Sequence, residues 1–323
     1  MALSKEAKRA YKKAQKAQNK KRKRHWLIIQ YGDSKKEIMS KIMTQLCCAV
    51  LICSVIILWD YFKAMFVNSK LNSSLQDLYG TVTENIVGTT DKGTILPNAQ
   101  ALLEINPDTV GWVKVEGTNI DNPVVLRKDD TPTSNYYLNH NFNGDEAKAG
   151  TIFLDYRTTL GYNKQSDNLV LYGHNEKDNS MFGDLDRYKN DIDFYRDHPI
   201  VKFNSNYETA DYKIIACFVT HTLPEQSYDG KVFDYQNYID FDEARYNDFI
   251  SNVMSRSQII TTVDYRYGDR FLTLSTCSNE FSNSRFVVVA RKVREGEDVG
   301  VDVLNAKVNE NAKEPDWDKI YGR

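Results

Sequence analysis

An uncharged apolar run of eighteen residues, from Ile42 to Trp59, constrains this chain more than any other feature. As a helix, a run of that length spans the hydrocarbon core of a bilayer. A cleaved signal peptide is the alternative, but the leader before the run is very long and no small-x-small cleavage site follows it. The sequence therefore predicts an uncleaved transmembrane signal anchor over residues 42–62.

The charges around this run predict its orientation. The first 24 residues carry eleven Lys and Arg against the single Glu6, whereas the whole chain has a net charge of -2. By the positive-inside rule, residues 1–41 form a basic cytoplasmic tail and the acidic body lies outside the cell. A basic tail beside a membrane helix is typical of a topology signal that contacts anionic lipid headgroups. We therefore expect membrane lipid, and no nucleic acid, as its partner.

The body of the chain has the pattern of a β protein. Residues 63–97 are polar and are expected to form a stalk with a partly helical start, followed by a short helix over residues 98–106. Short apolar runs broken by Gly, Asn, Asp and Pro then predict strands. These strands are expected at residues 111–117, 123–127, 150–156, 168–174, 200–204, 212–222, 258–264, 270–277 and 285–293. Eight or nine strands without regular helical crossovers favour a mostly antiparallel barrel or sandwich.

Two helical stretches interrupt the strands, at residues 180–190 and 242–257. The second is long enough to be a distinct element. Its predicted apolar side comprises Ala244, Tyr246, Phe249, Ile250 and Val253. Residues 98–295 are thus expected to form one catalytic domain, and residues 296–323 a charged, irregular C-terminal tail.

Of the five cysteines, three lie inside the apolar run, at Cys47, Cys48 and Cys53, where small packing side chains are expected. Cys217 and Cys277 lie in the exported part, where a disulfide between them is the structural alternative to chemistry. Cys217 is expected in the core, and its C-x3-H spacing to His221 has no second ligand pair, so no metal site is predicted. His140 and His198 carry no spacing signal and are expected to be exposed to solvent.

Three residues at strand ends form a chemically coherent set. Cys277 ends the apolar run RFLTLSTC, Arg285 begins the next strand eight residues later, and His174 ends NLVLYGH. A hairpin of this kind brings the thiol and the guanidinium to one rim. A thiol attacks only as the thiolate, which an adjacent cation favours.

This set predicts acyl transfer. The imidazole can protonate a leaving amine, and the guanidinium can stabilise the oxyanion of a tetrahedral intermediate. Asp184 could orient the imidazole of His174, although a solvated or helix-capping carboxylate is an equal alternative for it.

The motifs TLSTC (273–277), Arg285 in SRFVVVARKV, LYGHN (171–175) and MFGDL (181–185) together resemble the class B sortases. The resemblance runs from about Leu103 to Val293. It implies an eight-stranded sortase β-barrel with added N-terminal helices and a long helix between the sixth and seventh strands, which residues 242–257 would supply. In this chain the transmembrane helix precedes that fold.

The resemblance also implies a Cys-His-Arg site of Cys277, His174 and Arg285. The sequence itself shows no site for an organic cofactor, and none is expected. Substrate-groove or oxyanion contacts are implied for Tyr172, Leu138, Ser275 and Thr276. In this family the thiolate attacks the Thr carbonyl of an NPxTN-like sorting motif at the C-terminus of a secreted protein. A thioester forms, and an amine of the cell wall or of a peptidoglycan precursor releases it as a new amide. The expected location is therefore the cell membrane of a Gram-positive bacterium, with the catalytic domain outside.

Three alternatives remain open on the sequence. A pilin-polymerising sortase would use a lysine of another pilin as the accepting amine. A thiol protease would deliver the acyl group to water. A non-catalytic, membrane-tethered scaffold module would keep the barrel with an unreactive Cys277.

Overall fold

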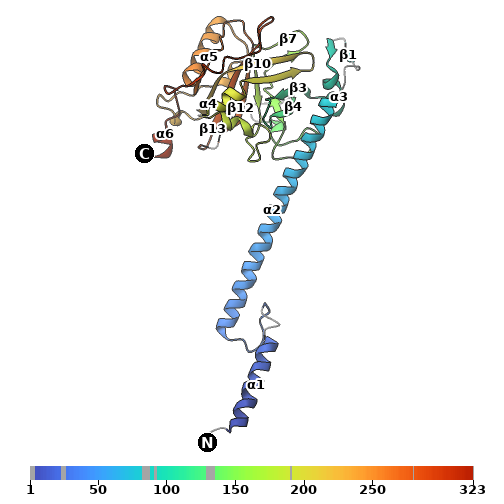
Figure 1. The fold of residues 1–323 in the computed structure, drawn as a ribbon, viewed down its shortest axis with the longest axis vertical. Coiled ribbons are helices and arrows are strands. Elements are labelled where there is room, and N and C mark those ends of the chain that lie inside the picture. Colours follow the sequence, from blue (N-terminus) through green and yellow to red (C-terminus); the bar gives the residue numbers. More distant parts are fainter. Residues whose placement is uncertain are drawn as a thin grey trace. The chain divides into compact units, whose positions relative to one another are not determined.

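Figure 1 shows the computed structural model, which describes residues 4–22, 27–81, 88–90, 93–128, 135–189, 191–278 and 280–322. The chain divides into two compact units, Met1–Phe66 and Val67–Arg323. The predicted nine strands and the predicted site all lie in the second unit.

The first unit contains helix α1 (Lys5–Arg22) and the greater part of helix α2 (Lys35–Thr81). Within the described residues, α2 is the one helix long and apolar enough to cross a membrane, with a mean hydropathy of 2.4 over its most apolar stretch. None of that stretch is buried by protein. A backbone hydrogen-bonded within the helix and apolar side chains exposed around it suit a lipid environment. By length and composition, the predicted anchor is compatible with this helix.

The end of α2 belongs to the second unit and packs against it. Leu75 is 2% exposed and lies in one cluster with Leu102 of helix α3 (Pro97–Ile105). The ring of Tyr79 stacks on that of Trp112 with centroids 4.3 Å apart. Leucines spaced by three and four residues give this polar segment one apolar stripe, which the barrel covers. Part of the expected stalk is therefore a packed continuation of the helix.

Eight strands close into a barrel in the order β10-β13-β12-β8-β5-β4-β3-β9. In chain order these are β3 (Thr109–Lys114), β4 (Asp121–Val125), β5 (Ile152–Leu154), β8 (Asn168–Tyr172), β9 (Ile200–Ser205), β10 (Thr209–His221), β12 (Phe271–Cys277) and β13 (Ser284–Lys292). The prediction of a barrel is confirmed. The ninth expected strand, residues 258–264, contributes only β11 (Ile259–Ile260), which pairs with β14 (Lys307–Val308) outside the barrel.

Most neighbouring barrel strands are antiparallel, but β4 pairs with β5 and β8 pairs with β12 in parallel. Four short strands outside the barrel form two antiparallel pairs, β1 (Gly88–Thr90) with β2 (Gly93–Ile95) and β6 (Leu160–Gly161) with β7 (Lys164–Gln165). The parallel pairing of β8 with β12 is decisive for the site, because carboxyl ends of parallel strands meet at one edge.

Helix α5 (Glu243–Arg256) lies between the sixth and seventh barrel strands, as expected, and Figure 1 shows it against the outside of the barrel. The side chain of Asp242 accepts a hydrogen bond from the backbone N–H of Arg245 and thereby caps the helix. Its buried face comprises Tyr246, Phe249, Ile250, Val253 and Arg256. Ala244, predicted on the apolar side, is exposed instead because it lies on the first turn, before the helix reaches the sheet.

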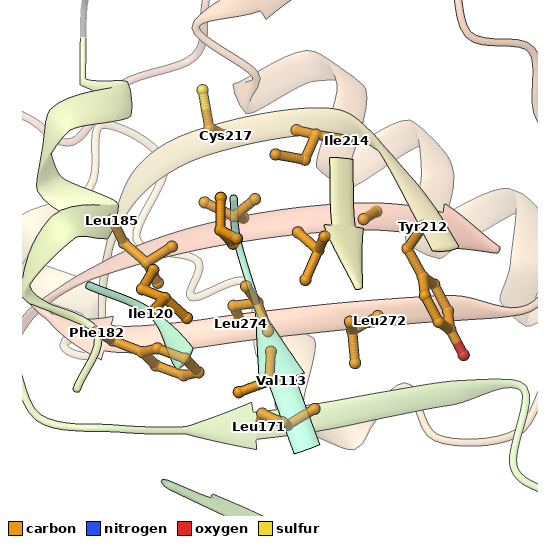
Figure 2. Close-up of a cluster of buried hydrophobic side chains, with 14 of the residues drawn as sticks. Val113, Ile120, Leu171, Phe182, Leu185, Tyr212, Ile214, Cys217, Leu272 and Leu274 are labelled. Carbon is orange, nitrogen blue, oxygen red and sulfur yellow. The ribbon is translucent and has the colours of Figure 1, made fainter. Parts of the chain in front are cut away.

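The interior of the barrel is filled by aliphatic and aromatic side chains from several strands. Figure 2 shows Leu171, Leu272 and Leu274 together with Cys217 in this cluster. Each of these leucines is 0% exposed, and burying such a side chain stabilises the fold by about 2 kcal/mol. The core thus fixes which faces of β8 and β12 point outward.

Helical structure between β8 and β10 is short. The predicted helix over 180–190 is the 3₁₀ helix η3 (Gly183–Tyr188), followed by α4 (Ile192–Asp197). Phe182, just before η3, and Leu185, within it, are fully buried and belong to the same core cluster as the barrel leucines.

The C-terminal segment, expected to be an irregular tail, packs on the second unit. Ala306 is 1% exposed, β14 pairs with β11, and the chain ends in helix α6 (Trp317–Tyr321). The prediction of a tail rested on the charge of this segment and overlooked the few apolar residues that anchor it.

Candidate active site

Cys277 and Arg285 are direct cross-strand partners in the antiparallel β12–β13 pair. On the other side of β12, the parallel register pairs Ser275 with Tyr172 of β8. Continued by two residues, that register sets His174 beside Cys277. The three predicted catalytic residues therefore come together at one edge of the barrel.

Alternation also directs all three side chains to the outer face of the barrel wall. Leu171 of β8 is in the core, so alternation continued past the end of the strand directs His174 outward. Leu272 and Leu274 of β12 are in the core, so alternation directs Ser275 and Cys277 outward. On β13, Phe286 is in the core, so Arg285 points outward as well. Cys277 is a free, exposed thiol. A large substrate can thus approach its sulfur from solvent.

The ring of His174 is oriented by a backbone carbonyl. Its Nε2 lies 2.7 Å from the carbonyl oxygen of Leu138, at the end of the 3₁₀ helix η2 (Tyr136–Leu138). In that contact Nε2 carries the proton and donates, which leaves Nδ1 as the basic nitrogen of the neutral ring.

Asp184 does not take this role. Its carboxylate is 1% exposed and accepts a hydrogen bond of 2.7 Å from the backbone N–H of Asn119. The carbonyl of Leu138, and not Asp184, is the partner of His174, because the carboxylate in η3 is bound to the turn between β3 and β4 that carries Asn119.

Asn175, for which no role was predicted, joins the two strand ends. Its side-chain amide donates to the carbonyl oxygen of Cys277 (3.0 Å) and to Asp186 (2.7 Å). The backbone N–H of Gly173 donates to the carbonyl of Ser275 (3.2 Å), and the next ladder bond would come from residue 175. The side chain of Asn175 supplies that bond in place of the backbone. Its position directly after the histidine in LYGHN was the available signal.

Beyond Asp186, ionic contacts continue to the loop after Cys277. Lys189 lies 2.8 Å from Asp186 and 2.8 Å from Glu280, and it donates to the hydroxyl of Ser278 (2.9 Å). These partly buried groups tie η3 to the β12–β13 loop. The sequence did not single them out because they are far apart along the chain.

Arg285 is half-buried at the start of β13. Its guanidinium donates to the carbonyl oxygen of Ser284 (2.9 Å). A guanidinium has five N–H donors, so a side chain held in this way can still bind an oxyanion.

The four residues for which the resemblance implied substrate or oxyanion contacts do not all lie at the surface of the site. Leu138 exposes 37% of its surface close to His174. Tyr172 donates through its hydroxyl to the buried Asp155 (2.8 Å), and burial raises its pKa, with the charge of Asp155 adding to the shift. Ser275 shares a hydrogen bond of 2.6 Å with the hydroxyl of Tyr235.

Thr276 lies on the opposite side of the strand from Cys277. It pairs with Phe286 and is 2% exposed. Alternation along β12 directs its side chain inward. The structure therefore brings Leu138 to the site surface, while Tyr172 and Ser275 lie in the wall below it.

The disulfide alternative is wrong, since Cys217 and Cys277 are both free. Cys217 is buried in the core, as expected, and burial raises the pKa of its thiol to about 12. His140 and His198, expected to be exposed, are half-buried and hydrogen-bonded to the carbonyls of Tyr136 and Glu116. Among the described residues, no group of three His, Cys, Asp or Glu side chains could hold a metal ion.

Comparisons with known proteins agree with this fold. A family model described as a sortase domain matches residues 113–293. The chain is 31% identical to sortase B of Listeria monocytogenes over 238 residues, which cover 73% of this chain and 90% of that protein.

Solved structures are also similar. The crystal structure of sortase B from B. anthracis in complex with AAEK1 has a TM-score of 0.59 at 28% identity, covering 72% of this chain and 99% of that one. The Staphylococcus aureus sortase B–substrate complex has a TM-score of 0.58 at 28% identity, covering 70% of this chain and 96% of that one.

The closed barrel and these matches define the second unit as a sortase domain. More narrowly, the chain belongs to the class B sortases, a family of cysteine transpeptidases that anchor proteins to the cell wall.

Proposed function

We propose that this chain is a membrane-anchored transpeptidase in which Cys277 attacks the Thr carbonyl of an NPxTN-like motif at the C-terminus of a secreted protein. One observation carries the proposal: the exposed thiol of Cys277 lies opposite Arg285 and at the end of the strand beside that of His174. The three groups needed for acyl transfer therefore share one rim and one face.

In the first half-reaction, the sulfur of Cys277 bonds to the Thr carbonyl carbon and the C–N bond to the next residue breaks. The guanidinium of Arg285 donates to the oxyanion of the tetrahedral intermediate. His174, in its protonated form, gives a proton to the leaving amine. The product is a thioester between Cys277 and the shortened protein.

In the second half-reaction, an amine of the cell wall or of a peptidoglycan precursor attacks the thioester carbonyl. His174 accepts the proton of that amine, the C–S bond breaks and the thiolate is restored. A new amide joins the protein to the wall.

Leu138 is the substrate contact that the geometry favours. Its side chain is exposed while its carbonyl holds His174, so one residue can meet the motif and fix the acid. Tyr172 and Ser275 support the wall below Cys277 through buried hydrogen bonds. The side chain of Thr276 packs on the inner side of the strand, so only its backbone can contribute to the site.

The same proposal assigns a topology. Residues 1–41 lie in the cytoplasm, residues 42–62 cross the membrane, and the domain from residue 98 onward works outside the cell. The excess of Lys and Arg before the span and the apolar helix α2 support this arrangement.

The test is an intact-mass measurement of the full chain in detergent, incubated with an NPxTN peptide. An adduct of the acyl fragment on Cys277 is expected in the native chain and not in Cys277→Ala. Cys53→Ala, which removes a thiol from the membrane helix, should keep the adduct. Absence of an adduct in the native chain would favour the non-catalytic scaffold. Adding a cell-wall amine, a pilin lysine peptide or only water then identifies the acceptor.

A further inference from the structure

The C-terminal segment extends beyond residues 113–293, the part that matches the family model, and it returns to the active-site rim. Strand β13 starts at the rim with Ser284 and Arg285 and ends at the opposite end of the barrel with Lys292. The chain then runs back along the outside, where β14 pairs with β11. By Asp316 its backbone N–H donates to the carbonyl of Gln226 (2.9 Å), a few residues beyond the end of β10. The packed structure thus continues beyond β13, the last strand of the barrel.

Helix α6 contacts the loop that joins Cys277 to Arg285. The hydroxyl of Tyr321 donates to the backbone carbonyl of Glu280 (2.7 Å). The ring of Trp317 meets Phe281 edge to face, with centroids 5.5 Å apart, and stacks on Tyr321 at 6.1 Å. An edge-to-face pair of this kind contributes more than its buried area alone. Two aromatic side chains of the C-terminal helix therefore hold one side of the loop.

A second connection reaches the same loop through the 3₁₀ helix η4 (Pro224–Gln226). Gln226 accepts from Asp316 through its carbonyl and donates through its side-chain amide to the carbonyl of Ser282 (2.8 Å). The side chain of Asp316 also caps α6 by accepting from the backbone N–H of Lys319 (3.0 Å). The C-terminal helix is thus built as a capped element with two separate attachments to the loop.

The opposite side of the loop is held by the site itself. Lys189 contacts both Ser278 and Glu280, and through Asp186 and Asn175 this chain of contacts reaches the carbonyl of Cys277. The loop lies between these two sets of contacts. The loop next to Cys277 and Arg285 is thus held from both sides.

We propose that helix α6 is a positioning element of the active site, in which Trp317 and Tyr321 fix the β12–β13 loop so that Cys277 and Arg285 meet the substrate carbonyl in a productive geometry. This inference rests on the proposed roles of Cys277 and Arg285. Small displacements of reacting groups cost far more in rate than in binding, so the effect belongs to the chemical step.

The experiment compares the full chain in detergent with four variants: a deletion of residues 316–323, Tyr321→Phe, Trp317→Ala and Trp317→Phe. The time course of thioester formation with an NPxTN peptide is followed by intact mass over a range of peptide concentrations. The deletion and Trp317→Ala are expected to lower the maximal rate by about ten- to a hundredfold with little change in KM. Tyr321→Phe keeps the stacked ring and should lose less. Trp317→Phe should recover most of the rate lost in Trp317→Ala.

Asn309→Ala is the matched control. It removes a hydrogen bond of 2.7 Å to the carbonyl of Ser257 from the same segment, away from the loop. It should keep the native rate, and an equal loss in this control would overturn the proposal in favour of general stability. A native rate in the deletion variant would also overturn it. If the deletion variant does not fold, Trp317→Ala decides in the same way: a lowered maximal rate that Trp317→Phe recovers supports the proposal, and a native rate in Trp317→Ala overturns it.

Hydrogen exchange separates this inference from the proposed function. Exchange at residues 280–284 is expected to rise in the deletion variant whether or not the chain is an active enzyme. If the native chain forms no thioester, the proposed function fails, and this measurement alone decides the role of α6. Unchanged hydrogen exchange at the loop would contradict the positioning role of α6.

Discussion

The side-chain amide of Asn175 lies 3.0 Å from the backbone carbonyl oxygen of Cys277, where the next backbone bond of the β8–β12 ladder would fall. This contact joins the residue after His174 to the candidate nucleophile. It fixes the separation of two strand ends that are 102 residues apart along the chain.

Replacing Asn175 by Ala should lower the rate of thioester formation by about tenfold, because the strand end that carries His174 loses its tie to Cys277. Asn175→Asp, which keeps the shape but cannot donate to the carbonyl, should lose as much. Both are measured by single-turnover acylation of the full chain. A native rate in both variants would show that this hydrogen bond does not position the site.

Replacing Arg285 by Lys should not preserve activity, although the charge is kept. A guanidinium presents several donors in a fixed plane, whereas an ammonium acts as a point charge. Loss of an oxyanion donor typically costs about 10²–10³ in kcat. Steady-state kinetics with an NPxTN peptide should show that loss with little change in KM. Nearly native kcat in Arg285→Lys would remove the oxyanion role from this residue.

Replacing Leu138 by Ala should raise KM more than it lowers kcat. The substitution removes an exposed side chain and leaves the carbonyl that accepts from His174. Peptide titrations at constant pH separate the two parameters. A selective fall in kcat would instead indicate that the side chain holds η2, and with it the imidazole, in place.

Replacing Glu297 by Gln should destabilise the domain without touching the site. Arg291 is 0% exposed and is paired with Glu297 and, at 3.3 Å, with Asp264. Breaking a buried pair typically costs about 3–5 kcal/mol, and the remaining Asp264 should reduce this to about 2 kcal/mol. Denaturant unfolding gives the difference in the free energy of unfolding. An unchanged midpoint would show that Asp264 alone satisfies Arg291.

The same carboxylate gives a pH dependence. Hydrogen bonds from Arg291 hold the pKa of Glu297 well below its usual range. The contribution of Glu297 to the free energy of unfolding is therefore present above the unfolded-state pKa of about 4.3 and is lost as the pH falls below it. The free energy of unfolding measured between pH 3 and pH 7 should fall less steeply in Glu297→Gln than in the native chain.

His221 gives a second pH dependence, of stability near neutral pH. Burial lowers the pKa of its imidazole, and the charge of Arg256 lowers it further. Its Nδ1 has no hydrogen-bond partner among the described residues, so a protonated ring is poorly accommodated. The unfolded chain binds more protons below about pH 6.5, and the free energy of unfolding should fall as the pH drops through that range. His221→Gln should flatten this part of the curve, and an equal slope in both chains would contradict the assignment.

The sequence by itself predicted the membrane helix, the barrel strands and helix α5. These depend on local patterns: a long apolar run, alternation along short runs, and an apolar stripe at helical spacing. It also placed Cys277, His174 and Arg285 at strand ends, because chemistry-bearing residues there interrupt apolar runs. The resemblance of TLSTC and LYGHN to the class B sortases then gave them roles, which stay predictions until the adduct is measured.

Tertiary structure alone decided that the strand end of His174 meets that of Cys277. The parallel register of β8 with β12 brings residues 174 and 277 together, and no local pattern encodes a pairing across that length of chain. It also replaced Asp184 by the carbonyl of Leu138 as the partner of His174, since every residue carries a carbonyl and its direction depends on the fold. The C-terminal segment was predicted to be a tail because its charge is visible in the sequence, whereas its contacts with distant residues are not. Its few aromatic residues find their partners only once the β12–β13 loop is in place beside Cys277.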